Sequence, residues 1–114
     1  MDKKGKKYSQ NKPKVGMLFS QMSRALNAVA LAATHGNNKY SKDEFWDENF
    51  ANVPNAFEEY SDGLGRHLLL ETQESVDKDS KMPHEVHVAW NALARLEVKL
   101  RNDEKESDRE VQWW

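Results

Sequence analysis

Three segments of this chain repeat their apolar residues every three or four positions, at residues 17–35, 55–73 and 83–100. This spacing places the apolar side chains on one face of an α-helix. In the first segment these residues are Leu18, Met22, Ala25, Val29 and Ala32. Gly36 follows that segment and is expected to end its helix. The pattern therefore predicts three long helices and an all-α fold.

The length and composition set limits on the class of protein. A chain of 114 residues is expected to form one domain with a modest core. It has no cysteine, which excludes disulfides and thiolate metal sites. No apolar run approaches the roughly 18 residues of a membrane span, and the basic start is not followed by the apolar stretch of a secretory signal. We therefore expect a cytoplasmic protein with no membrane partner.

Charge is unevenly distributed along the chain. Residues 1–14 carry six lysines and one aspartate, which gives this segment a charge of +5. Because the net charge of the whole chain is −2, the remaining residues carry a charge of −7. We interpret residues 1–14 as a flexible basic tail and residues 15–114 as a single helical domain. The tail can contact nucleic acid or phosphates, but the acidic body disfavours a nucleic-acid partner. An acidic body suits a site that holds a divalent cation through carboxylates.

The second predicted helix carries polar residues on its apolar stripe. The stripe consists of Phe57, Tyr60, Leu64 and Leu68. His67 and Glu71 fall on or beside it, and inward-facing polar groups are costly unless they are paired or bind a ligand. A satisfied core histidine and a ligand-binding one both remain open. Gly63 and Gly65 indicate either the close approach of a neighbouring element or a kink.

The third predicted helix has Pro83 in its first turn and two different faces. Its main apolar stripe is predicted to be Val86, Ala89, Leu93, Leu96 and Leu100. His84, His87 and Asn91 lie on nearly the opposite side, so we expect partner helices, or a second protomer, on both sides. His84 and His87, three residues apart, can either ligate one metal ion or form a solvated first turn.

Aromatic residues mark the remaining segments. Residues 37–54 contain Tyr40, Phe45, Trp46 and Phe50. They either pack on the core or stack on a base or sugar. Ser41 and Glu44 resemble a capping box and predict a short helix. Trp113 and Trp114 are expected to dock on the body or on a second subunit.

Several motifs follow one another in a fixed order. They are Ala28–Tyr40 with Phe45-Trp46, Arg66-His67, Glu74-x-x-Asp77, and Ser80-x-x-x-His84-x-x-His87-x-x-Trp90-Asn91. Together they resemble the phage-encoded dATP/dGTP diphosphohydrolase N-terminal family, within the all-α nucleotide pyrophosphohydrolases related to MazG. The resemblance covers roughly residues 17–100. It implies a compact bundle of three long helices plus short helices, completed by oligomerisation.

The resemblance also implies a reaction and a site. The reaction is hydrolysis of dATP or dGTP to monophosphate and pyrophosphate by a homo-oligomer, with Mg²⁺ or Mn²⁺ as cofactor. The implied catalytic residues are His67, His84 and His87. The implied substrate-binding residues are Lys39, Tyr40, Trp46, Arg66 and Asn91. The implied metal ligands are Glu71, Glu74 and Asp77.

Two other functional interpretations remain open. The MazG-type carboxylate signature is represented only by Glu58, Glu59 and Asp62. A non-catalytic nucleotide-binding or host-modulating phage accessory protein of the same fold would account for this. A helical interaction module that uses Trp113 and Trp114 as its contact is the third interpretation.

Overall fold

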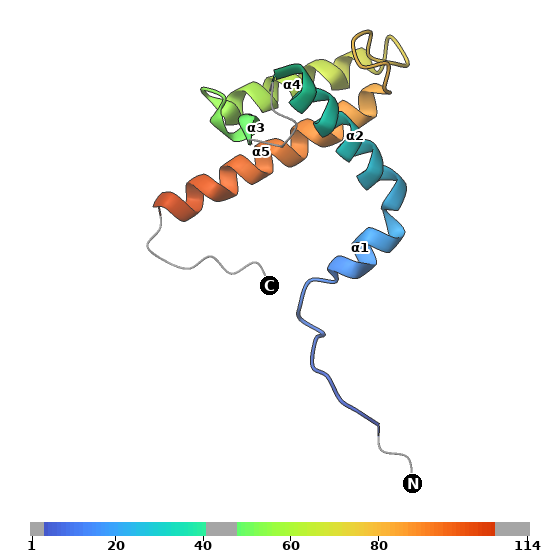
Figure 1. Cartoon of the computed structure of the whole chain (residues 1–114), viewed down its shortest axis with the longest axis vertical. Helices are drawn as coiled ribbons and strands as arrows, with labels where there is room; N and C mark the ends of the chain where they lie inside the picture. The colour runs from blue at the N-terminus through green and yellow to red at the C-terminus, as the bar shows by residue number, and fades with distance from the viewer. Residues whose placement is uncertain (1–3, 41–47, 107–114) are drawn as a thin grey trace.

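The computed structural model describes residues 4–40 and 48–106 and contains five helices there (Figure 1). They are α1 (Val15–Gln21), α2 (Ser23–Tyr40), α3 (Asn49–Asn52), α4 (Ala56–Leu70) and α5 (His84–Glu106). Within these ranges there is no β-strand, and β-type backbone pairing is limited to one isolated antiparallel bridge between Val76 and Pro83. The protein is therefore all-α, and α2, α4 and α5 are the three predicted long helices.

The main interface lies between α4 and α5, which are joined by the loop at residues 71–83 (Figure 1). The two helices run in opposite directions, and α2 crosses α5 close to this loop. Small residues allow the helices to approach closely, because Ala56 and Gly63 of α4 and Ala94 of α5 are buried. The loop and the end of α2 are thereby brought to the first turn of α5.

The predicted main stripe of α5 is wrong. Leu93 and Leu96 are each 50% exposed. The buried residues of α5 are His84, Asn91, Ala94 and Val98, which is the side that carries the histidines. The structure buries these polar groups because both His84 and Asn91 have hydrogen-bond partners, which offset the cost of removing them from water.

The predicted end of the first long helix is also wrong. We expected Gly36 to stop it, but α2 continues to Tyr40. A glycine inside a helix costs only about 1 kcal/mol relative to alanine, which contacts at the end of a helix can offset. Lys39, in the last turn, forms an ion pair with Asp79 of the 71–83 loop. The N-terminal boundary differs as well, since residues 15–21 form the separate helix α1.

Other expectations agree with the structure or fall outside it. α4 begins directly after Asn55, as predicted, but ends at Leu70, before a turn at residues 71–73. On its stripe, Phe57, Tyr60, Leu64 and His67 are partly buried, whereas Leu68 is exposed. The helix predicted from Ser41 and Glu44 and the docking of Trp113 and Trp114 concern positions outside the described residues.

The N-terminal part of the chain packs least. α1 extends away from the α4–α5 pair, and each of its residues is exposed (Figure 1). Its exposed side chains include Val15, Met17, Leu18 and Phe19. Among the described residues, no helix combines the length and the apolar character needed to cross a membrane.

Candidate functional site

The three predicted catalytic histidines converge where α4 meets the first turn of α5. The Nδ1 atoms of His67 and His84 are 2.8 Å apart, and the ring centroids of His67 and His87 are 4.6 Å apart in a stacked arrangement. His84 is completely buried. One chain therefore assembles the three imidazoles, because α4 and α5 turn their histidine-bearing sides toward each other.

The loop at residues 71–83 adds two carboxylates to this histidine cluster. Oε1 of Glu74 lies 2.9 Å from Nε2 of His84. Oδ2 of Asp77 lies 4.0 Å from Nε2 of His87. The same Asp77 oxygen accepts the backbone N–H groups of Ser80, at 2.8 Å, and of Asp79, at 3.1 Å. These backbone bonds fix the Asp77 side chain in the site.

Ser80 is a residue of the site that was not assigned a role from the sequence. Its Oγ lies 2.6 Å from Nε2 of His87 and accepts the backbone N–H of Met82 at 3.2 Å. The hydroxyl therefore holds the His87 ring on the side that faces the loop. The regular spacing of Ser80, His84 and His87 in one motif was the signal that pointed to it.

The C-terminal end of α2 closes one edge of the cluster. Nζ of Lys39 lies 2.9 Å from Oδ2 of Asp79, and Nε2 of His35 lies 3.4 Å from the same oxygen. The hydrogen bond from Lys39 lowers the pKa of Asp79, and the same bond raises the pKa of Lys39. Neither His35 nor Asp79 was predicted, because contacts across 40 and 44 residues leave no local sequence pattern.

The surroundings of the cluster keep two of its imidazoles neutral at neutral pH. Burial is the largest cause that lowers the pKa of His67, followed by the nearby His87. Burial likewise lowers the pKa of His87, although the charge of Asp77 opposes the shift. Burial alone would raise the pKa of Asp77, but hydrogen bonds from Ser80 outweigh it and the pKa is lowered. The site thus offers neutral imidazoles beside an ionised carboxylate.

Hydrogen bonding orients the buried imidazole. With Glu74 ionised, its oxygen only accepts, so Nε2 of His84 carries the proton and donates it. The other ring nitrogen, Nδ1 of His84, faces Nδ1 of His67. A carboxylate behind one ring nitrogen, with the other nitrogen directed into the site, is the usual arrangement around a metal-binding histidine.

The donor atoms fit a divalent cation. His67, Asp77 and His84 each offer one ligand atom, and these atoms lie within 4.8 Å of one another. Neighbouring ligands of an ion bound at about 2.1 Å are separated by roughly 3 Å. The 2.8 Å between the two Nδ1 atoms is close to that separation. Two imidazoles and one carboxylate favour Mn²⁺ over Mg²⁺, which prefers oxygen ligands.

Some predicted site residues are not among these three donors. Glu71 follows α4 and is close to Glu85, and burial and the hydrogen bond with Glu85 raise its pKa. Arg66 has an exposed side chain on α4. Asn91 is buried between the helices and donates from Nδ2 to the carbonyl oxygen of His87 at 2.7 Å. Trp46, which was predicted to bind the substrate, lies outside the described residues.

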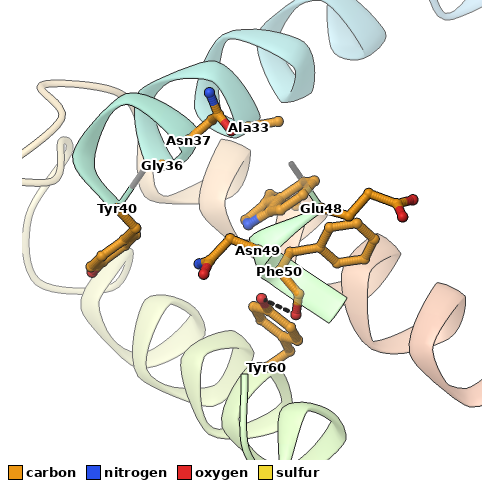
Figure 2. Close-up of a pocket in the computed structure, with 9 residues that line it drawn as sticks. Ala33, Gly36, Asn37, Tyr40, Glu48, Asn49, Phe50 and Tyr60 are labelled. Atoms are coloured by element: carbon orange, nitrogen blue, oxygen red, sulfur yellow. Dashed lines mark hydrogen bonds between the residues drawn. The ribbon is translucent and has the colours of Figure 1, made fainter. Parts of the chain in front are cut away.

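An aromatic cleft lies beside the cluster, between α2, α3, α4 and α5 (Figure 2). Its volume is about 450 Å³, part of which is open to solvent. Its aromatic lining consists of Tyr40, Phe50, Tyr60 and Trp90. The Tyr60 hydroxyl donates to the carbonyl oxygen of Phe50 at 2.7 Å, which ties α3 to α4. Only Tyr40 of these four was assigned to a substrate from the sequence.

Together, the fold and the site define a small all-α protein with a histidine- and carboxylate-lined centre beside an aromatic cleft. The chain belongs to the family described as dATP/dGTP diphosphohydrolase, N-terminal, whose model matches residues 2–109. This confirms the resemblance carried by the ordered motifs. Comparisons with curated proteins and with solved structures find no significant match.

Proposed function

We propose that this protein hydrolyses a purine deoxynucleoside triphosphate, dATP or dGTP, to the monophosphate and pyrophosphate, as a phage-type enzyme in the host cytoplasm. The observation that carries the proposal is the fully buried His84, held between Glu74 and His67 with Asp77 nearby. Burying these polar groups costs free energy, and a residue that served packing alone would not require it. The description of the family supports a nucleotide substrate.

The proposal assigns His67, His84 and Asp77 as ligands of the cofactor, Mn²⁺ or Mg²⁺. Glu74 is proposed to orient His84 rather than to ligate, because its oxygen faces the Nε2 atom that points away from His67. When bound, the cation neutralises charge on the phosphate oxygens and lowers the pKa of a coordinated water.

His87 is the proposed general base. Its lowered pKa keeps the imidazole neutral at neutral pH, the form that accepts a proton. Water attacks the α-phosphorus and gives its proton to His87, while the bond to the bridging oxygen breaks and pyrophosphate leaves. Asp77, at 4.0 Å, stabilises the imidazolium that forms, and Ser80 holds the ring.

Lys39 is the proposed contact to the phosphate oxygens. Its ammonium has three donors, of which one goes to Asp79. Tyr40, the next residue, borders the aromatic cleft, so the end of α2 joins the polar centre to that cleft. The predicted roles of Arg66 and Asn91 in substrate binding receive less support. Arg66 is exposed, and the contacts of Asn91 favour helix packing.

The proposed active form is a homo-oligomer. α1 and the residue after it expose a concentration of apolar side chains, which is uncommon on soluble monomers. They are Val15, Met17, Leu18, Phe19 and Met22. Light scattering coupled to size exclusion is expected to show more than one copy. The double variant Leu18→Ser/Phe19→Ser is expected to lower the mass, and a monomeric parent protein would contradict this part of the proposal.

The activity is tested by separating the products of each deoxynucleoside triphosphate after incubation with Mn²⁺. We expect monophosphate and pyrophosphate from dATP or dGTP, and a rate reduced at least about 100-fold in His87→Gln, given the usual contribution of a general base. Asp77→Asn is expected to be similarly impaired. Glu59→Gln, at an exposed position of α4, is the matched control and should retain full activity. Equal rates in all four proteins would exclude this site.

A nucleotide-binding protein without hydrolytic activity is the second candidate. The observation that favours it is the position of Glu58, Glu59 and Asp62, which are exposed on α4 and lie outside the three-residue donor group. A thermal-shift assay separates the two candidates. Stabilisation by dATP or dGTP with chelator present, together with no pyrophosphate release when Mn²⁺ is added, supports the binding protein.

A further inference from the structure

The outer side of α5 carries a row of apolar residues whose spacing alternates between three and four positions. We call this row the α5 seam, and it consists of Val86, Ala89, Leu93, Leu96 and Leu100. Leu93 and Leu96 are each 50% exposed, and Ala89 is exposed as well. The buried residues of α5 lie on the opposite side of the helix. The α5 seam therefore faces away from α4.

The spacing of the α5 seam is that of a surface on which two helices pack. Alternating steps of three and four repeat every seven residues, and this period keeps the same face of a helix against a partner helix. The solvent side of a helix that packs only within its own chain has no need of such a row. Exposed apolar residues that form a continuous row mark an interaction surface. The α5 seam therefore has the pattern of a helix-pairing surface.

The charges beside the α5 seam indicate which helix covers it. Glu85, Ala92 and Lys99 follow one another at intervals of seven along one flank, and all three are exposed. A second copy of α5 that runs antiparallel places Glu85 of one copy beside Lys99 of the partner subunit, and the reverse. Ala92 of each copy then lies near the two-fold axis, where a small side chain allows close approach. The surface is thus complementary to itself, as a two-fold dimer requires.

Glu85 lies in an acidic neighbourhood that a lysine would stabilise. Burial raises the pKa of Glu71, and the hydrogen bond with Glu85 and its charge raise it further. The ammonium of Lys99 has three donors, and its pair with Asp103 in the same chain is exposed. Antiparallel pairing would bring this ammonium to the carboxyl groups of Glu71 and Glu85. Parallel pairing would instead place the acidic pairs of both copies at the same end of the interface.

We infer that the α5 seam is an interface with a second copy of this chain, in which two α5 helices pack antiparallel with Glu85 of each beside Lys99 of the other. The inference goes beyond the proposed function, because this surface lies on the side of α5 opposite the buried His84. It is also distinct from the apolar face of α1, and it holds whether or not the protein hydrolyses nucleotides.

Chemical cross-linking tests the pairing, because the chain has no cysteine of its own. In Ala92→Cys the two introduced thiols lie near the axis, and a short bismaleimide is expected to join two chains. Lys105→Cys, at an exposed position of the same helix, is the matched control. With a rise of about 1.5 Å per residue, the two copies of this position lie roughly 40 Å apart along antiparallel helices and should not be joined.

Charge reversal tests the direction of the two helices. Glu85→Lys alone and Lys99→Glu alone each place like charges together twice in the dimer, which is expected to weaken association about tenfold. The two changes combined restore opposite charges and should restore the association. Light scattering over a dilution series measures this in the Leu18→Ser/Phe19→Ser background, which removes the apolar face of α1. Parallel helices would keep positions 85 and 99 apart, and the combined change would then restore nothing.

A pair of leucine variants tests the apolar contact. Leu93→Ser/Leu96→Ser is expected to abolish cross-linking at position 92. Leu68→Ser/Leu69→Ser changes two comparably exposed leucines of α4 and should leave the cross-link intact. Because all four positions are exposed, neither variant is expected to disturb the helical content, which circular dichroism checks.

Three results would overturn the inference. They are the absence of a cross-link in Ala92→Cys, a combined charge reversal that fails to restore association, and loss of the cross-link in Leu18→Ser/Phe19→Ser. The last result would place α1 of the second copy on the α5 seam. A cross-link that forms in a protein releasing no pyrophosphate supports the interface and contradicts the proposed hydrolysis. The two failures are therefore distinguishable.

Discussion

Gly63 of α4 and Asn91 of α5 meet so closely that a Cβ atom at position 63 would lie 2.4 Å from Oδ1 of Asn91. Asn91 is held in place by its hydrogen bond to the carbonyl oxygen of His87. His67 lies one turn beyond Gly63, and His87 lies one turn before Asn91. This contact therefore sets the helix spacing next to the histidine cluster.

Replacing Gly63 with alanine is expected to destabilise the fold. Overpacking typically costs about 1–3 kcal/mol, which exceeds the gain of up to about 1 kcal/mol from a better helix former. Gly65→Ala is the matched control, because a Cβ there meets nothing within 4 Å. It should stabilise the protein by up to about 1 kcal/mol. Urea unfolding of both variants checks this, and equal stabilities would show that the helices can separate freely.

Glu74→Gln is expected to weaken metal binding by about 10- to 100-fold, the usual effect of removing a carboxylate that orients a metal-binding histidine. The amide keeps the size of the side chain but removes the charge that favours the proton on Nε2 of His84. Calorimetric titration of the metal-free protein with Mn²⁺ measures the effect. Glu58→Gln, at an exposed site on α4, is the control. Identical affinities in the two variants would place the ion elsewhere.

The stability of the metal-free protein is expected to decrease in mild acid. The folded-state pKa values of His67 and His87 are lowered from 6.5, chiefly by burial. Just below that pH the unfolded chain binds more protons than the folded one, so the free energy of unfolding rises with pH across this window. This contribution to stability is lost as the pH falls from the unfolded-state pKa of the two histidines through their folded-state pKa values. The lowered pKa of Asp77 makes the stability depend on pH only near and below pH 3.8, which is outside this window.

Urea unfolding with chelator, between about pH 5 and about pH 7.5, measures this dependence. His87→Gln removes one of the two titrating groups and is expected to make the slope shallower. A stability that stays constant or rises toward acid would contradict the neutral imidazoles in the folded protein.

The helices were predictable because their periodicity is local. The ordered apolar residues of α2, α4 and α5 revealed three long helices, and the exclusion of cysteine chemistry needed only the composition. The buried face of α5 was not predictable from the same pattern. Leu93 and Leu96 are more apolar than His84 and Asn91, yet the polar pair is buried. Its partners come from the 71–83 loop, from α4 and from the backbone of α5 itself, and side-chain hydrogen bonds do not appear in a hydrophobic pattern.

The candidate site was likewise predictable only in part. His67, Glu74, Asp77, His84 and His87 were recognised through ordered motifs, and the structure brings them together. The aromatic cleft was largely missed, because its lining comes from four helices that are far apart in the sequence. Such a surface is defined only when α2 crosses α5.

Lys39→Met separates a structural role of this residue from a role in substrate binding. The ion pair with Asp79 is largely exposed, so its loss is expected to change the free energy of unfolding only slightly. If the remaining donors of Lys39 bind phosphate, the variant should lose about tenfold or more in kcat/KM, the usual effect of removing a charged hydrogen bond. Lys99→Met removes a comparably exposed pair with Asp103 on α5 and should leave kcat/KM unchanged. Steady-state kinetics and urea unfolding are measured on both proteins. An activity that changes equally little in the two variants would limit Lys39 to anchoring α2 on the loop.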